Sequence, residues 1–312
     1  MHTRKIEQQE VFMNTIINIQ LFSDRSTIYS QEKIRNAFGY FAKVVEKYTR
    51  FDPKSELSLL NNSGGEPHKV TKEFYDLIEY MLKLSNLTDG SYDPTIIDLL
   101  ETYGYKSTYD FESLDDPELL NKITTLVKVR AKPSEIVLSP KDLSVQLGKR
   151  QRLDLGSIGK GYAVDLAFDE LKEFSAVMIN AGGDIRVKGP KPDGQAWRVG
   201  LYYGQLPNKE LHQESSLGTI DLMDGSVSGS GGWARKVKFF HHLLNPRTGI
   251  PINEISQTYV LAPSALESDA WSTVLFTLGD KGLTLLESNG YQGLVVLSDG
   301  KVSTTKNFPL TN

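Results

Sequence analysis

The sequence contains no cysteine among its 312 residues. Disulfides, thiolate metal sites and cysteine nucleophiles are therefore excluded, and any metal must be held by oxygen or imidazole ligands. Histidine is scarce, with five copies. No apolar run approaches the roughly 18 residues of a membrane-spanning helix, and the polar N-terminus lacks the apolar core of a signal peptide. A precursor whose leader has been removed would begin in the same way.

Positive charge is also in short supply, since the formal net charge is -4. Nucleic-acid binding is disfavoured because phosphate contacts need clustered Lys and Arg. The 39% hydrophobic and 24% charged residues fit an ordinary globular protein with a sizeable core. No linker of Pro, Ser and Gly divides the chain, so we expect one domain over residues 1–312, with about the first ten residues as a flexible leader.

Two hydrophobic periods recur along the chain and predict both strands and helices. Alternating, β-branched segments predict strands at residues 14–22, 175–189, 197–203, 218–222, 257–262 and 293–298. Helical periodicity is found at residues 31–50, 71–88, 159–173, 267–279 and 281–289. The order does not alternate strictly between strand and helix, which favours an α+β fold with largely antiparallel sheets and flanking helices.

Three glycines lie where an extended stretch meets a helix, in the segment from Leu153 to Asp165. Glycines let the backbone approach an anion, and the helix dipole favours negative charge at that end. The segment is thus either a phosphate-binding turn or a plain glycine-containing helix start. Its spacing matches neither the P-loop nor the dinucleotide-binding pattern.

The segment from Ser226 to Pro251 combines a small-residue run, adjacent histidines and the turn Asn-Pro-Arg-Thr-Gly. A histidine can take a proton from a hydroxyl nucleophile, and Arg247 can hold a phosphate. A surface hairpin with solvated basic residues is the alternative. A shorter segment, Asn180 to Ile185, is either a tight turn or a functional glycine pair ahead of a carboxylate.

Asp269 and Thr273 lie four residues apart in a predicted helix, so their oxygens face the same way. Hard oxygen ligands suit Mg²⁺, which keeps water and substrate phosphate in its other positions. The competing interpretation is helix N-capping by Ser268 or Asp269.

These segments, in this order, resemble the FAD:protein FMN transferase family, the ApbE-like flavin transferases. Upstream, the resemblance includes Phe51-Asp-Pro-Lys-Ser-Glu-Leu-Ser-Leu-Leu-Asn61, Tyr92-Asp-Pro-Thr95 with Tyr103-Gly-Tyr105, and Val11-Phe-Met-Asn-Thr15. It therefore extends over nearly the whole chain.

The resemblance implies a role for each of the following residues. It places a metal on Asp269, Ser272, Thr273 and the backbone carbonyl of Gly159. It places flavin contacts on Ser55, Asn61, Asp93, Pro94, Thr95, Gly156, Lys160, Tyr162, His242, Leu243 and Arg247. It implies catalytic roles for His242, Asp269 and Lys160, with His241 as the competitor for the base. The family's aspartate before Pro-Arg-Thr-Gly is Asn245 here, so this chain lacks the charge at that position.

The implied reaction is Mg²⁺-dependent transfer of FMN from FAD to a Thr or Ser hydroxyl of an acceptor protein, with release of AMP. A Mg²⁺-dependent FAD pyrophosphatase and a non-catalytic FAD-binding protein are the alternatives. Members of the family are often exported and lipid-anchored, so we expect an extracytoplasmic, lipid-anchored protein, with a cytoplasmic location as the alternative.

Overall fold

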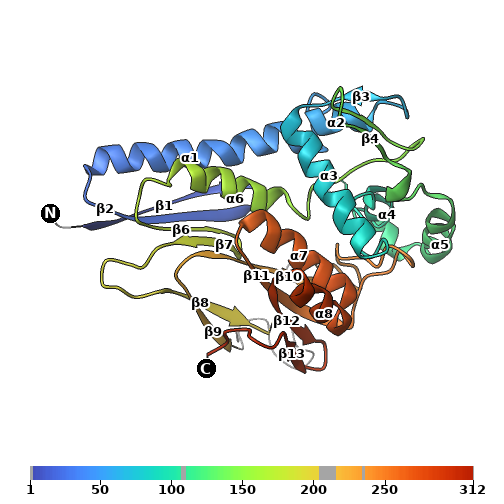
Figure 1. Ribbon diagram of the computed structural model, residues 1–312. Helices are drawn as coiled ribbons and strands as arrows, with labels where there is room; N and C mark the ends of the chain where they lie inside the picture. Colours follow the sequence, from blue (N-terminus) through green and yellow to red (C-terminus); the bar gives the residue numbers. More distant parts are fainter. Residues whose placement is uncertain (1–2, 107–109, 204–215, 234–235, 312) are drawn as a thin grey trace. The chain divides into compact units, whose positions relative to one another are not determined.

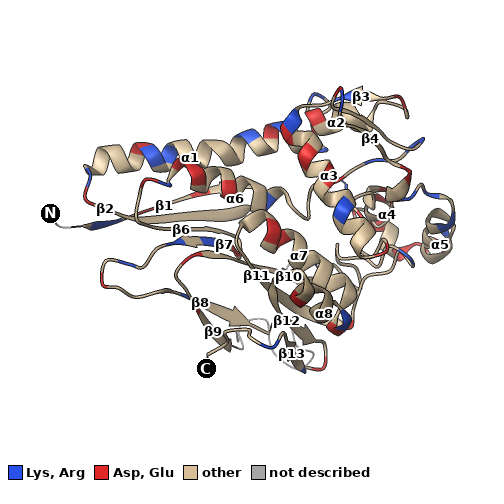
Figure 2. Ribbon diagram, viewed as in Figure 1, with Lys and Arg blue, Asp and Glu red and all other residues tan. Residues whose placement is uncertain are grey.

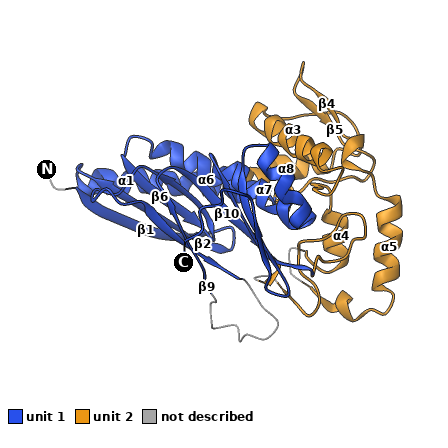
Figure 3. Ribbon diagram, turned by 60° about the horizontal axis from the view of Figure 1, so that its bottom comes forward, with its two compact units in different colours: residues 1–45, 156–231, 254–312 blue, residues 46–155, 232–253 orange. Residues whose placement is uncertain are grey.

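The computed structural model describes residues 3–106, 110–203, 216–233 and 236–311. The chain divides into two compact units, each built from more than one stretch of sequence (Figure 3). Unit 1 comprises residues 1–45, 156–231 and 254–312, and unit 2 comprises residues 46–155 and 232–253. The expectation of one domain over residues 1–312 stays a prediction.

Unit 1 is organised around an eight-stranded sheet in which every described pairing is antiparallel. In spatial order its strands are β1 (Arg4–Phe12), β2 (Thr15–Ser23), β6 (Ala176–Ala181), β7 (Asp184–Lys188), β10 (Gly225–Gly231), β11 (Ile255–Ala262), β12 (Gln292–Leu297) and β13 (Val302–Thr304). A separate antiparallel pair is formed by β8 (Trp197–Tyr202) and β9 (Ser216–Leu222). The α+β class with antiparallel sheets is thus confirmed.

Helices of unit 1 cover one face of the large sheet, as Figure 1 shows. They are α1 (Thr27–Tyr48), α6 (Gly159–Glu170), α7 (Ala265–Leu278) and α8 (Asp280–Ser288). Helix α6 packs against β6 and β7, and α7 packs against β7, β10 and β11. Side chains alternate between the two faces of β2, and Ile17, Ile19 and Leu21, which share one face, are fully buried. The residues between them point to the other face of the sheet. Trp197 and Ile220 of the β8–β9 pair cover part of the opposite face.

The expected flexible leader is wrong for residues 4–12, which form strand β1. This strand pairs with β2 along its whole length, from Arg4 opposite Ser23 to Phe12 opposite Thr15. The ring of Phe12 also stacks on Phe38 and Phe41 of α1. Most other side chains of β1 are exposed. The polar side chains that suggested a flexible leader therefore belong to an edge strand, which is held in the sheet by its backbone pairing with β2.

Unit 2 is mostly helical. Its elements are α2 (Glu56–Asn61), α3 (Lys72–Leu87), α4 (Ile97–Thr102), α5 (Leu119–Val129), two 3-10 turns (Glu112–Asp115 and Pro133–Glu135) and the three-stranded sheet of β3 (His68–Lys69), β5 (Ser144–Gln146) and β4 (Val137–Ser139). One of its cores gathers Leu99 and Tyr103 with Ile123 and Phe240. Residues 232–253 thus supply core side chains to this unit as well as the histidines.

Both signs of charge occur along the same elements, for example along α1 and α3 (Figure 2). Among the described residues, no helix has the length and apolarity that crossing a membrane requires.

Candidate functional site

The glycine segment has no regular structure at residues 153–155, turns at residues 156–158 and enters α6 at Gly159. Ile158 occupies the N-cap position, where its apolar side chain cannot bind the first-turn amides. One of these amides, the N–H of Gly161, donates instead to Oδ2 of Asp269 at 3.0 Å. The positive end of α6 therefore faces a carboxylate of α7.

Gly161 permits this contact because it has no side chain. A Cβ at position 161 would lie 2.2 Å from the carbonyl oxygen of Ala265 and 2.8 Å from Cβ of Asp269. Both distances are shorter than real Cβ contacts, so only glycine lets the two helices approach so closely. The conformation at Gly161 is helical, and the requirement is steric.

Asp165, one turn further along α6, holds the start of α7. Its two carboxylate oxygens accept the N–H groups of Ala265 and Leu266 at 2.8 and 2.9 Å. Oδ1 also accepts Nη1 of Arg186 at 2.6 Å. Burial raises the pKa of Asp165, while Arg186 and the two amides act against that rise.

The N-cap of α7 is Ser264, whose Oγ accepts the N–H of Glu267 at 3.2 Å. The helix begins at Ala265, so Ser268 and Asp269 both lie inside it. The hydroxyl of Ser268 donates to the carbonyl of Ala265 at 3.2 Å. The interpretation that Ser268 or Asp269 caps the helix is therefore wrong, because neither residue occupies the cap position.

Asp269 lies in the second turn of α7 with only 5% of its surface exposed. Burial raises the pKa of its carboxyl from 3.8 to about 7, and the negative charge of Asp184 adds to the rise. Lys160 and the Gly161 amide oppose the shift. The ionised form of this buried acid would be stabilised by any cation that reaches it.

Asp269 belongs to a group of charged side chains that we call the α6–α7 cluster, which comprises Asp165, Asp184, Asp269, Lys160 and Arg186. This cluster has one carboxylate more than it has cations. Lys160 pairs with Oδ2 of Asp184, and Arg186 pairs with Asp165. Asp269 is the third carboxylate, so the formal count is three negative charges against two positive ones when all three acids are ionised. A divalent cation would reverse that imbalance.

Only some of the predicted magnesium donors are available to bind a cation beside Asp269. Asp269 and Thr273 share a face of α7, and Thr273 is partly buried. Ser272 is committed elsewhere, since its Oγ donates to the Asp269 carbonyl at 2.8 Å and lies 2.7 Å from Oγ of Ser230. Within the described ranges, no group of three or more His, Asp and Glu side chains has the arrangement of a metal site. Oxygen donors from hydroxyls, the Gly159 carbonyl and substrate phosphate are therefore needed to complete a Mg²⁺ shell.

In unit 2, the predicted flavin residues Asp93 and Thr95 form a tight cluster with Arg130. Oδ1 of Asp93 accepts both the N–H and the hydroxyl of Thr95 at 2.7 Å, and Oδ2 pairs with Arg130. The carbonyl of Pro94 accepts the N–H of Asp154 at 2.9 Å. These side chains therefore shape the backbone of this turn.

Asn61 holds Leu153, the first residue of the glycine segment. Its Nδ2 donates to the carbonyl of Leu153 at 2.9 Å, and its Oδ1 accepts the N–H of the same residue at 2.7 Å. Ser55 caps α2 by accepting the N–H of Ser58 at 3.0 Å. Both predicted entrance residues thus have structural partners in unit 2.

The adjacent histidines have different surroundings. His241 is 4% exposed, its Nε2 lies 3.1 Å from the carbonyl of Ile252, and its Nδ1 accepts the N–H of Leu243 at 3.3 Å. Burial lowers the pKa of His241. His242 is only partly buried, and its ring stacks on Tyr105 with centroids 6.3 Å apart.

Arg247 is exposed and binds Asp89, with Nη2 at 2.6 Å from Oδ2 and 2.8 Å from the carbonyl oxygen. Asn245, in place of the family's aspartate, accepts the N–H of Arg247 on Oδ1 at 2.9 Å. A neutral amide is sufficient for that turn.

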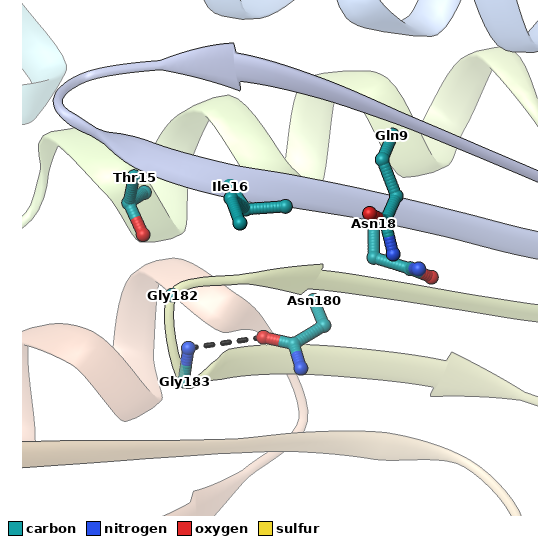
Figure 4. Close-up of a pocket in the computed structure, with 7 residues that line it drawn as sticks. All are labelled: Gln9, Thr15, Ile16, Asn18, Asn180, Gly182 and Gly183. Atoms are coloured by element: carbon teal, nitrogen blue, oxygen red, sulfur yellow. Dashed lines mark hydrogen bonds between the residues drawn. The ribbon is translucent and has the colours of Figure 1, made fainter.

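A pocket of about 380 Å³ lies in unit 1 where the β1–β2 and β6–β7 turns meet (Figure 4). Its lining residues are Gln9, Thr15, Ile16, Asn18, Asn180, Gly182 and Gly183. Oδ1 of Asn180 accepts the N–H of Gly183 at 3.0 Å, as the dashed line shows. The predicted metal and flavin residues are not among the described residues that line this pocket.

In unit 1, Gly159 and Lys160 lie in the first turn of α6, and Asp269, Ser272 and Thr273 lie on α7, which contacts α6 through the bond from Gly161 to Asp269. Unit 2 carries Ser55, Asn61, the turn at residues 93–95 and the histidines. Sequence reasoning did not select Asp165 or Asp184 as site residues. Each lies in a segment that it had noted, and a carboxylate directly after Gly182-Gly183 was the available signal.

Comparison with known proteins gives a consistent result. Residues 13–295 match the model of the ApbE family. An FAD:protein FMN transferase of Haemophilus influenzae is 26% identical, over 97% of this chain and 90% of its own length. One from Escherichia coli K12 is also 26% identical, over 86% of this chain and 77% of its own length.

Two solved structures share the fold. The ApbE protein of Thermotoga maritima has a TM-score of 0.86 at 26% identity and covers 98% of both chains. The flavin transferase ApbE of Vibrio cholerae has a TM-score of 0.84 at 22% identity, over 99% of this chain and 100% of its own, and supports the fold alone. With the family model matching most of its length, this chain belongs to the ApbE family.

Proposed function

We propose that this chain is a Mg²⁺-dependent FAD:protein FMN transferase. The observation that carries the proposal is the near full-length match to curated proteins of that name. The surroundings of Asp269 add chemical support, since the N-terminus of α6 suits a diphosphate and the buried carboxylate suits a divalent cation.

The reaction balances as a phosphoryl transfer. The acceptor Thr or Ser oxygen forms a bond to the phosphorus of the FMN half, and the bond from that phosphorus to the bridging oxygen breaks. AMP leaves with the bridging oxygen, and the hydroxyl proton passes to a base on the protein. FMN remains on the acceptor as a phosphoester.

Asp269, Thr273 and the Gly159 carbonyl are the residues that would hold Mg²⁺. The ion would supply Lewis-acid stabilisation of the charge that develops on the diphosphate. Lys160 adds positive charge at the same helix end, where Asp184 fixes its ammonium group.

His242 is the residue we assign as base. Both ring nitrogens of His241 are engaged with backbone groups, and burial lowers its pKa, which makes the ring a weaker proton acceptor. His242 is more exposed than His241, so it is the better placed of the two to meet an incoming hydroxyl, with Nε2 as the acceptor because Nδ1 is buried.

The test is direct detection of the product. Candidate acceptor proteins are incubated with the chain, FAD and Mg²⁺, and covalent flavin is located on a Thr or Ser by mass spectrometry while AMP is measured. FMN and AMP released without acceptor would indicate the pyrophosphatase instead. Bound FAD with no AMP under any condition would indicate a binding protein.

An extracytoplasmic, lipid-anchored location belongs to the same proposal and rests on family resemblance. Fractionation of cells that express the native gene product, followed by immunoblotting, tests it. Recovery in the cytoplasmic fraction would contradict the proposed location and leave the proposed reaction unaffected.

A further inference from the structure

Asp184, at the start of β7, has incomplete hydrogen bonding among the described residues. The side chain is 1% exposed, and its Oδ1 is buried with no hydrogen-bond partner there. Its Oδ2 pairs with Lys160. Buried carboxylate oxygens are normally satisfied, so an oxygen left in this state indicates an absent water or ion.

The hydrogen bonds of the other two carboxylates, Asp165 and Asp269, can be compared with those of Asp184. Asp165 uses both oxygens, on Ala265, Leu266 and Arg186. Asp269 receives the Gly161 amide on Oδ2. Asp165 thus uses both oxygens on protein groups, whereas the described contacts of Asp184 and of Asp269 each use Oδ2.

The backbone fixes where Asp184 points. It is the first residue of β7, pairs with Ala181, and follows two glycines with φ of 62° and 101°. A Cβ at Gly182 would meet Oγ1 of Thr15 at 2.3 Å, so the turn is closely fitted. Strand β7 packs against both α6 and α7, and the charge of Asp184 is felt at Asp269.

The hydroxyls nearest along the neighbouring strand are already engaged. Oγ of Ser228 and Oγ of Ser268 lie 2.8 Å apart, and Ser226 donates to the carbonyl of Ile185 at 2.7 Å. These groups tie β10 to α7 and β7. They do not supply the missing partner of Asp184.

We propose that Asp184 is a further oxygen donor of the cation centre, with Oδ1 binding the metal ion directly or through one metal-bound water. The inference rests on the proposed function. It adds a second carboxylate to the predicted donors, and it gives Asp184 two partners, Lys160 on one oxygen and the ion on the other.

Mn²⁺ is the probe, because it replaces Mg²⁺ at oxygen sites and gives an anomalous X-ray signal. Crystals of the full chain soaked in Mn²⁺ without FAD are expected to show the ion at Asp269, with Asp184 Oδ1 or its bound water in the coordination shell. An ion at Asp269 whose shell omits both would overturn the inference and leave the proposed function standing.

Binding in solution supplies the second measurement. Mn²⁺ titration followed by electron paramagnetic resonance should give a dissociation constant at least about tenfold higher for Asp184→Asn, and Asp184→Glu should not restore it fully because its oxygens are displaced. The exposed pair at Arg198 provides the control, since Asp221→Asn should bind Mn²⁺ as the unchanged chain does.

The outcomes separate the two claims. An unchanged dissociation constant in folded Asp184→Asn removes the inference alone. Failure of the unchanged chain to bind Mn²⁺ removes the inference and the metal part of the proposed function together. If Asp184→Asn does not fold, the soaked crystal of the unchanged chain decides.

Discussion

Replacing Gly161 with alanine tests the close contact between α6 and α7. The new Cβ would lie 2.2 Å from the Ala265 oxygen and 2.8 Å from Cβ of Asp269, so α7 must move away. Overpacking costs about 1–3 kcal/mol, the lost amide bond to a carboxylate costs about 1.5–3 kcal/mol, and alanine returns about 1 kcal/mol of helix propensity. The free energy of unfolding should therefore fall by about 3 kcal/mol.

Urea unfolding followed by circular dichroism and by tryptophan fluorescence measures this change, since Trp271 is buried on α7. Gly39→Ala is the matched control. Gly39 also lies in a helix, nothing described comes within 4 Å of its added Cβ, and alanine there should stabilise the protein by about 0.5–1 kcal/mol. If Gly161→Ala were as stable as the unchanged chain, the steric argument for the helix contact would be refuted.

Three further predictions concern charge, catalysis and the start of the glycine segment. The folded protein keeps the Asp269 proton up to about pH 7, whereas the unfolded chain releases it near 3.8. Unfolding thus releases a proton between these values, so without metal the stability contributed by this group falls as pH rises from about 4 to about 7, and Asp269→Asn should flatten that part of the profile in chelator. His242→Ala should lower the rate of FMN transfer about 10²–10⁴-fold in single turnovers, and His241→Ala should mainly reduce thermal stability; the reverse pattern would move the base to His241. Asn61→Ala should lower the free energy of unfolding by about 2–3 kcal/mol, because it leaves the backbone amide and carbonyl of Leu153 unpaired. Asn62 is an exposed neighbour, so Asn62→Ala should change this free energy little. Equal stability of the two variants would contradict a stabilising role for the bonds from Asn61 to Leu153.

Periodicity in the sequence was sufficient for the long elements. The strand predicted at residues 14–22 is β2 (Thr15–Ser23), and the helix predicted at residues 267–279 is α7 (Ala265–Leu278). Elements with weak periodicity were missed, including β1 and the central strand β10, whose sequence is Gly-Ser-Val-Ser-Gly-Ser-Gly. Small hydroxyl residues form β10 because Ser226 and Ser228 bond to Ser268 of α7, which no local pattern could reveal.

The sequence by itself determined the fold class, the family and the segment types that carry the candidate chemistry, because these depend on local period and motif order. The tertiary structure decided which carboxylates meet. Asp165, Asp184 and Asp269 lie far apart in the chain, and their charges and pKa values depend on burial and on neighbours such as Lys160 and Arg186. Distances of that kind arise only when helices and strands pack, so sequence spacing could not supply them.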